Sequence, residues 1–147
     1  MATNGVIVLR GASIVGALVR EDAAAAEAIT PGHLIEFDTV GDLQKHATAN
    51  GSAKRLIALS RDEIGKEITV AYAAGDTVKY APLVSGCEYN MILAISQTIA
   101  RGDALTSAGD GTLHAAAGTA ADRIVAYAAE AVTTGGAATA RIAVQAA

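Results

Sequence analysis

A pattern near residue 30 recurs further along the chain, and this internal similarity constrains the fold more than any other feature. Ile29-x-x-Gly32 resembles Ile99-x-x-Gly102, and Leu43 and Leu113 each lie eleven residues after the glycine of their copy. A true repeat predicts two related units wrapped around one core. The alternative is a chance similarity in a chain rich in alanine.

The repeat changes its spacing after its first part. The sequence Arg-Leu-Ile-Ala-Leu at 55–59 resembles Arg-Ile-Val-Ala-Tyr at 123–127, which lowers the spacing from 70 to 68 residues. Side chains of a strand alternate between its two faces, so a slip of two residues within a turn leaves every face unchanged. The predicted superposition pairs Gly32, Leu43 and Leu56 with Gly102, Leu113 and Ile124.

The residues around the repeat favour strands and turns. Apolar side chains alternate with polar ones at 67–72 and 77–80, and again around Ile142 and Val144, whereas 89–95 is apolar enough for burial on both faces. Asn50-Gly51 is typical of a two-residue hairpin turn, here joining 43–49 to 52–59. The fifteen glycines mostly occupy turn-like positions, as in a chain that reverses often.

Composition decides which residues can form the core. Alanine accounts for 35 residues and contributes little buried area, so the core must depend on the 33 Val, Ile and Leu residues. Together with the strand pattern, this predicts a mainly β fold, a compact barrel or sandwich with an internal pseudo-two-fold repeat. The core is small for 147 residues, which favours further burial in an oligomer.

The first 28 residues differ from the remainder, and we predict an N-terminal arm at 1–28 followed by a β-rich domain at 29–147. The arm contains a short apolar run, Val6-Ile7-Val8-Leu9, and an alanine-rich stretch at 23–28 with the length of one or two helical turns. An unpaired strand is a template for pairing with another chain, so the apolar run is a candidate contact with a partner surface or a neighbouring subunit. Alternatively, it completes the protein's own sheet.

Charge and targeting features exclude several classes of protein. The net charge is −4 and the 11 basic residues are scattered, whereas nucleic-acid binding needs a basic stripe. The longest apolar stretch near the start, 12–19, is far shorter than the roughly 20 residues that span a bilayer. No signal peptide is recognisable, so we expect a protein made and kept in a cytoplasm-like compartment.

No residue pattern predicts catalysis, a cofactor or a metal. Cys87 follows Ser85-Gly86 in a turn-like setting but lacks the Gly-x-Ser-x-Gly pattern of a nucleophile, and a lone cysteine forms no internal disulfide. His33, His46 and His114 lack metal-ligand spacing. We therefore predict that the chain is not an enzyme and that it binds no cofactor.

Five segments combine Gly-Asp turns, a glycine-rich stretch, an alanine-rich run and a final Ile-x-Val, namely 73–78, 98–105, 109–113, 123–131 and 140–144. Together they resemble the small capsid decoration proteins, or head cement proteins, of tailed phages. In that family a Gly-Asp turn opens a strand, a glycine-rich hairpin follows, and an alanine-rich strand precedes a final Ile-x-Val strand. This resemblance makes the run Val6-Ile7-Val8-Leu9 a candidate contact with the capsid or a neighbouring subunit. The resemblance covers about half of the chain.

The resemblance implies a structural virion protein with a bacterial host. Proteins of this family bind the outer capsid surface, often as trimers, and clamp adjacent coat subunits against the pressure of the packaged DNA. The partners implied are therefore the major capsid protein and further copies of the chain, with no direct contact to nucleic acid or membrane.

Two other functions remain open at this stage. A biotinyl or lipoyl carrier domain is also a small β fold with an internal repeat, but its modified lysine stands at a hairpin tip, and Lys45 and Lys54 only flank Asn50-Gly51. A β module that binds sugars or a host surface generally uses aromatic platforms, and this chain has one Phe, four Tyr and no Trp.

Overall fold

A computed structural model describes residues 7–10, 21–51, 55–61, 64–119 and 122–147, and within these ranges the chain forms strands and no α-helix. The strands are β1 Val8–Arg10, β2 Glu21–Ala24, β3 Leu34–Phe37, β4 Leu43–Lys45, β5 Leu56–Ala58, β6 Thr77–Pro82, β7 Glu88–Leu93, β8 Thr98–Ile99, β9 Ala104–Ser107, β10 Leu113–Ala115, β11 Ala126–Ala128, β12 Val132–Thr133 and β13 Ala140–Ala146. The predicted mainly β fold class is confirmed.

The first five-stranded sheet, barrel 1, has the order β2-β6-β5-β3-β4. A single parallel bridge between Ala25 and Leu43 brings the end of β2 beside β4 and completes the ring. The interior holds a cluster of apolar side chains that includes the fully buried Ile35, Leu43 and Val78. The alternation read at 77–80 is confirmed, because Val78 and Tyr80 are both buried.

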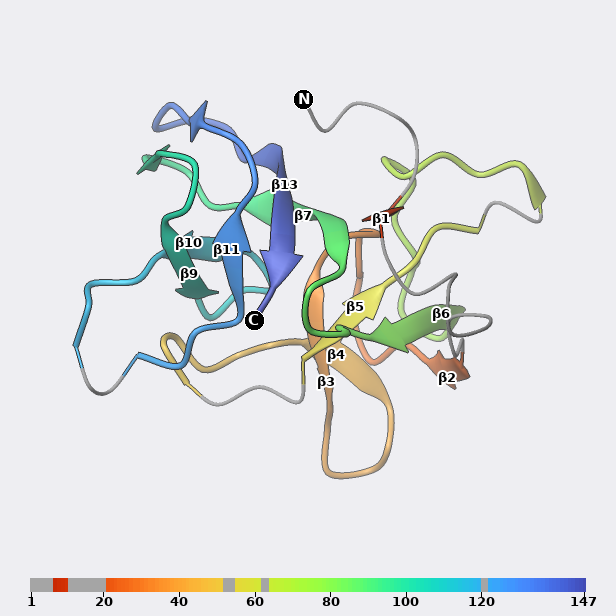
Figure 1. Cartoon of the computed structure of the whole chain (residues 1–147). Helices are drawn as coiled ribbons and strands as arrows, with labels where there is room; N and C mark the ends of the chain where they lie inside the picture. The colour runs from red at the N-terminus through yellow and green to blue at the C-terminus, as the bar shows by residue number, and fades with distance from the viewer. Residues whose placement is uncertain (1–6, 11–20, 52–54, 62–63, 120–121) are drawn as a thin grey trace.

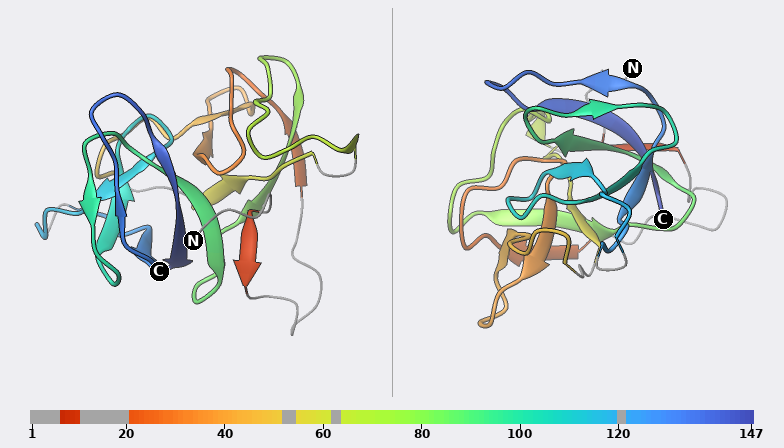
Figure 2. Two further views of the ribbon diagram at one scale, coloured as in Figure 1. Left: turned by 90° about the horizontal axis from the view of Figure 1, so that it is seen from above. Right: turned by 90° about the vertical axis from the view of Figure 1, so that its left-hand side faces the viewer.

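The second ring, barrel 2, consists of β7, β13, β11, β9 and β10, and it closes where β10 pairs in parallel with β7. β7 is buried from Tyr89 to Leu93, as expected, but the burial predicted to continue to 95 does not, because Ile95 lies beyond the strand and is 44% exposed. β1 adds to the outside of this ring by pairing antiparallel with β7. Figure 1 shows the two barrels side by side, and Figure 2 shows the same separation from above.

The two barrels have the same strand register, which confirms the internal repeat. In barrel 1, Ile35 pairs with Lys45 on one side and with Leu56 on the other. In barrel 2, Leu105 pairs with Ala115 and Ala126, each of which lies 70 residues after its barrel 1 counterpart. The spacing of 70 therefore holds through β5 and β11, and the predicted match of Leu56 with Ile124 is wrong.

The turn before β3 also recurs before β9. Gly32 and Gly102 both adopt positive φ, at 97° and 94°, which favours glycine. The N–H of Gly32 donates to the carbonyl of Ala58 in β5, and that of Gly102 to Ala128 in β11, each at 2.8 Å, so each turn is bonded to the equivalent strand of its own barrel. The conserved geometry explains why these glycines were visible as a repeat in the sequence.

Barrel 1 and barrel 2 share one apolar cluster. It combines interior side chains of barrel 2, such as Met91, Leu105 and Leu113, with Leu34 and Ile57 on the outside of barrel 1. Backbone hydrogen bonds cross the same junction, from Leu34 N to Gly111 O at 2.8 Å and from Gly111 N to His46 O at 3.2 Å.

Three local expectations were wrong because contacts distant in sequence determine the backbone. Asn50-Gly51 does not join paired strands, since β4 and β5 both pair with β3, and Asn50 instead hydrogen-bonds Ser107 and Arg123 of barrel 2. Residues 67–72 contribute one isolated bridge, from Tyr72 to Ile29, rather than a strand. Helical turns were expected at 23–28, but the first residues of this stretch belong to strand β2, which pairs with β6.

Candidate functional site

The outer face of barrel 1 is occupied by barrel 2. Leu34, Ile57 and Ala81 lie in one row across β3, β5 and β6, since Leu34 pairs with Ile57 and Ile57 with Ala81. All three are fully buried and belong to the cluster shared with barrel 2. This face is therefore an interface within the chain.

The equivalent face of barrel 2 is open. Ala104, Tyr127 and Gln145 lie in one row across β9, β11 and β13, and they occupy the positions of Leu34, Ile57 and Ala81 in barrel 1. We call these three residues the barrel-2 outer row.

Tyr127 is the prominent side chain of this row. Its side chain is 44% exposed, whereas the other three tyrosines are buried. The Gln145 side chain is also exposed, and its amide donates to Gly86 O at 3.2 Å. A tyrosine on an open sheet face offers a large amphipathic contact area, which is typical of interface positions.

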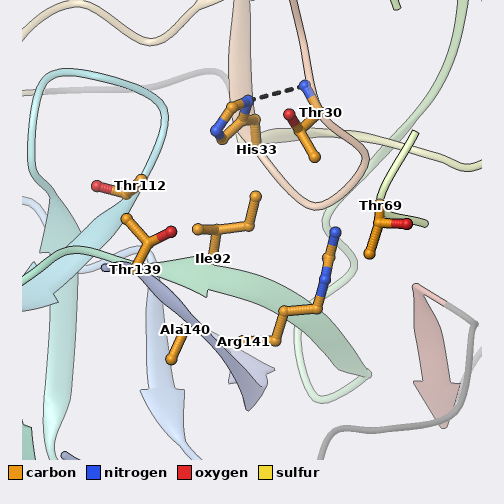
Figure 3. Close-up of a pocket in the computed structure, with 8 residues that line it drawn as sticks. All are labelled: Thr30, His33, Thr69, Ile92, Thr112, Thr139, Ala140 and Arg141. Atoms are coloured by element: carbon orange, nitrogen blue, oxygen red, sulfur yellow. Dashed lines mark hydrogen bonds between the residues drawn. The ribbon is translucent and has the colours of Figure 1, made fainter. Parts of the chain in front are cut away.

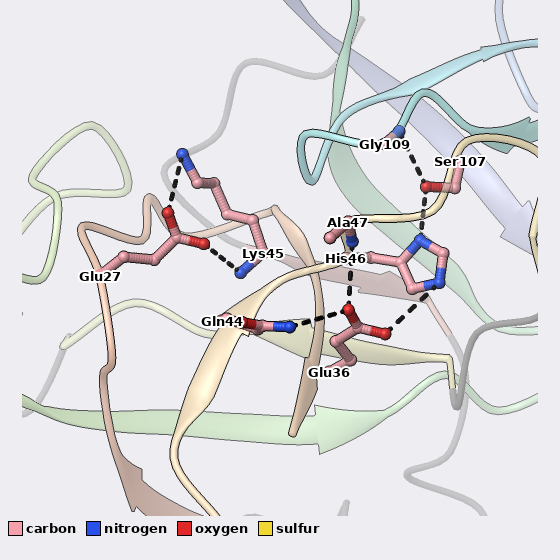
Figure 4. Close-up of polar contacts among 8 residues, drawn as sticks. All are labelled: Glu27, Glu36, Gln44, Lys45, His46, Ala47, Ser107 and Gly109. Carbon is pink, nitrogen blue, oxygen red and sulfur yellow. Dashed lines mark hydrogen bonds and ion pairs between the residues drawn. The ribbon is translucent and has the colours of Figure 1, made fainter. Parts of the chain in front are cut away.

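A buried polar network joins the two barrels at His46 (Figure 4). His46 Nδ1 lies 2.6 Å from the Ser107 hydroxyl of β9, and His46 Nε2 lies 3.7 Å from Glu36 Oε2 of β3. Glu36 Oε1 also accepts hydrogen bonds from the Gln44 amide and from Ala47 N. The network thus connects strands of barrel 1 to barrel 2.

The serine, histidine and glutamate of this network resemble the composition of a hydrolase triad, but their surroundings indicate a structural role. A nucleophile must reach a substrate carbonyl, and the side chains of Ser107 and His46 are 0% exposed. In addition, the Ser107 oxygen accepts a hydrogen bond from Gly109 N at 3.1 Å. This arrangement stabilises the junction and leaves no approach for a substrate.

A pocket of about 310 Å³ lies at the junction (Figure 3). We call it the inter-barrel pocket. Its lining consists of Thr30, His33, Thr69, Ile92, Thr112, Thr139, Ala140 and Arg141. It therefore draws polar side chains from the turn before β3, from the loop after β5 and from the start of β13.

His33 caps its own turn at the edge of this pocket. Thr30 N donates to His33 Nδ1 at 3.0 Å, so Nδ1 is an acceptor and the imidazole is neutral. The pKa of His33 is lowered to about 4, first by burial and then by the nearby Lys45 and Arg141, which together outweigh the opposing Asp110 and Glu27. In barrel 2 the same cap is a carboxylate, because Ala100 N donates to Asp103 Oδ2 at 2.8 Å.

The residues singled out in the sequence do not gather at one place. Val6 lies outside the described residues. The side chain of Ile7 is buried in the shared apolar cluster, and its carbonyl accepts a hydrogen bond from Asn90 N at 2.6 Å. Val8 begins β1 and Leu9 lies within it, so this run pairs with β7 of the chain's own sheet. Its role as a contact with a capsid or a subunit stays a prediction.

The remaining candidates occupy separate environments. Cys87 is buried, and His114 bonds Asn50 Oδ1 at 2.7 Å. Lys45, which mattered for the carrier-domain alternative, pairs with Glu27 at 3.5 Å, and Lys54 lies outside the described residues.

Two further features concern a metal site and a membrane-spanning helix in the described residues. No group of three or more His, Cys, Asp or Glu side chains there could hold a metal ion. In the same ranges no helical segment has the length and apolar character to cross a membrane.

Comparison with known proteins gives a match in fold alone. No protein-family model matches the chain, and no curated protein matches it in sequence. Among solved structures, the N base of the head fiber gp8.5 of bacteriophage phi29 matches with a TM-score of 0.57 and 16% sequence identity. The match covers 89% of this chain and 95% of that chain, so the two share a fold over almost their whole length.

Proposed function

We propose that this chain is a structural protein of a phage head that binds the outer capsid surface and stabilises it by clamping adjacent coat subunits. The observation that carries the proposal is the shared fold, over 89% of the chain, with the base of a head fiber. The resemblance of 98–144 to capsid decoration proteins points independently to the same class. On this proposal the major capsid protein is the partner and no chemistry is performed.

Binding to heads tests this proposal directly. Purified chain is added to heads of its own phage that lack it, and the heads are pelleted and imaged. We expect saturable co-sedimentation, new density on the outer surface, and greater resistance of DNA-filled heads to heating. Heads that bind no more of the chain than of an unrelated acidic β protein would contradict the proposal.

Self-association, most simply as a homotrimer, is a second part of the proposal. The barrel-2 outer row is the surface that we assign to it, because the equivalent positions of barrel 1 already form an apolar interface within the chain. Sedimentation of the chain with Tyr127→Glu should show weaker association, whereas Val40→Glu, at a hairpin position that is 79% exposed, serves as the matched control. Equal association of both variants would contradict this assignment.

The role of the N-terminal run is tested by deleting residues 1–10. Because Ile7 is buried and β1 pairs with β7, we expect the deletion to lower the melting temperature. A contact role requires a loss of head binding beyond that of Ile7→Ala, which weakens the same packing without removing the backbone. If the deleted chain binds heads in full, the run has no role in attachment.

A further inference from the structure

We propose that the inter-barrel pocket binds a small monocarboxylate group. This inference does not depend on the proposed role in a phage head. It rests on hydrogen-bond donors that line one cavity, and on a half-buried positive charge that no carboxylate of the described residues balances.

The donors come from both barrels, and none has an acceptor among the residues that the structure describes. Since His33 Nδ1 accepts from Thr30 N, the ring proton is on Nε2, and no described residue accepts a hydrogen bond from it. Thr30, Thr69 and Thr139 also line this cavity, and their hydroxyls make no hydrogen bond to the described residues, so on the exposed Thr69 and Thr139 they are open to solvent or to a ligand. Figure 3 shows these residues around the pocket, with Ile92 between Thr139 and Arg141. A ligand that supplies acceptor oxygens would satisfy them together.

The charge comes from Arg141. Its Nη2 donates to the carbonyls of Pro31 at 2.8 Å and Ile68 at 2.6 Å, which fixes the guanidinium in place. Its Nη1 is shielded from solvent and has no hydrogen-bond partner in the part of the chain that the structure describes. Burial lowers the pKa of Arg141, and no described carboxylate forms an ion pair with it. An anion in the pocket would offset the cost of this half-buried cation, which has no carboxylate partner.

The other charged groups nearby are already engaged. The Asp110 carboxylate accepts hydrogen bonds from the backbone and the hydroxyl of Thr112, and these bonds lower its pKa although burial would raise it. Lys45 is paired with Glu27 at 3.5 Å. Arg141 is therefore the unbalanced charge that a ligand of this pocket meets.

The size and walls of the pocket favour a carboxylate with a short apolar body. One unbalanced cation matches a monoanion better than a phosphate dianion. Ile92 and Ala140 supply apolar wall, and about 310 Å³ is at the small end of the range for ligand sites. The same group can come from a free solute or from an Asp or Glu side chain of a partner protein, because both present one carboxylate on a short carbon chain.

Titration of the full chain with butyrate, followed by NMR at neutral pH, tests the proposal. We expect saturable chemical-shift changes at His33 and Thr139, because the carboxylate supplies acceptor oxygens to both side chains. Butyramide, which has the same shape without the charge, should bind at least tenfold more weakly. Equal binding of butyramide, or no saturation by butyrate, would overturn the proposal.

Variants of the lining threonines locate the binding site, and peptide ligands distinguish a free solute from a protein side chain. Thr139→Val and Thr69→Val should each weaken the affinity for butyrate by about 3- to 10-fold, because each removes one donor. Thr133→Val, at an exposed position in β12, should leave this affinity unchanged. Butyrate binding that Thr139→Val and Thr69→Val leave intact would place the site elsewhere and overturn the proposal. Peptides with a single Asp or Glu, titrated in the same way, distinguish a protein side chain from a free solute as the stronger ligand.

Discussion

Barrel 1 and barrel 2 have the same strand register but different surroundings on their outer faces. In barrel 1 the row Leu34, Ile57 and Ala81 is fully buried against barrel 2, whereas in barrel 2 the corresponding Tyr127 is 44% exposed. Identical backbone pairing therefore does not decide which face of a barrel becomes an interface. The side chains on the outward positions, and the partner available to cover them, make that difference.

The largest difference between the barrels should appear when these outer rows are truncated. Ile57→Ala should lower the free energy of unfolding by about 2–5 kcal/mol, because it opens a cavity in the shared cluster. Tyr127→Ala should lower it by only about 0.5 kcal/mol in the monomer, because the side chain is partly exposed. Urea unfolding at low protein concentration measures both, and similar values would show that the two faces are equally buried.

The two glycines before β3 and β9 sharpen the comparison. Gly102→Ala should cost about 1–2 kcal/mol from positive φ alone, because a Cβ there meets nothing within 4 Å. Gly32→Ala should cost about 1–3 kcal/mol more, because its Cβ would lie 2.6 Å from Arg141 Nη1 and 3.0 Å from Asn90 O. Thermal or urea unfolding measures the difference, and equal costs would mean that the junction tolerates the methyl group.

The caps of the same two turns differ in their response to pH. The pKa of His33 is about 4 in the folded chain and about 6.5 when unfolded, so the unfolded state binds more protons between these values. The free energy of unfolding should therefore fall by at most about 3 kcal/mol as pH drops from 6.5 to 4.

His33→Asn is the matched variant for this prediction. Asparagine keeps the acceptor for Thr30 N, as Asp103 does for Ala100 N in barrel 2, but it does not titrate. We expect the difference in stability between the variant and the natural chain to change over this pH range. Parallel stability curves for the two proteins would show that His33 does not titrate as described.

The smallest effect concerns the tips of the β3–β4 and β9–β10 hairpins. Asp38 Oδ1 accepts hydrogen bonds from the N–H groups of Val40, Gly41 and Asp42 at 2.9 Å each. Asp38→Ala should therefore lower the free energy of unfolding by about 1 kcal/mol. Val40→Asp, which introduces the residue found at position 110 of barrel 2, should change it by less than about 0.5 kcal/mol. Urea unfolding of both variants decides whether the carboxylate of residue 38, rather than one at position 40, stabilises the hairpin tip.

The sequence alone predicted the fold class and the strands that face a core. The alternation around Val78, Tyr80 and Ile142 was readable because a strand exposes its two faces with a period of two residues. The candidate sites were not readable. Tyr127 was taken as the counterpart of Leu59, and its true counterpart, the buried Ile57, became visible only through the pairing of β9 with β11.

What the sequence by itself determined was the local part of the structure: the alternating strands, the glycines with positive φ and the existence of a repeat. Only the tertiary structure decided the register and the junction. A slip of two residues preserves the face of every side chain, so the period that revealed the strands could not distinguish a spacing of 68 from one of 70. Likewise, the pocket lined by His33 and Arg141 depends on how the barrels pack, because Arg141 bonds the carbonyl of Pro31, which lies 110 positions away in the sequence.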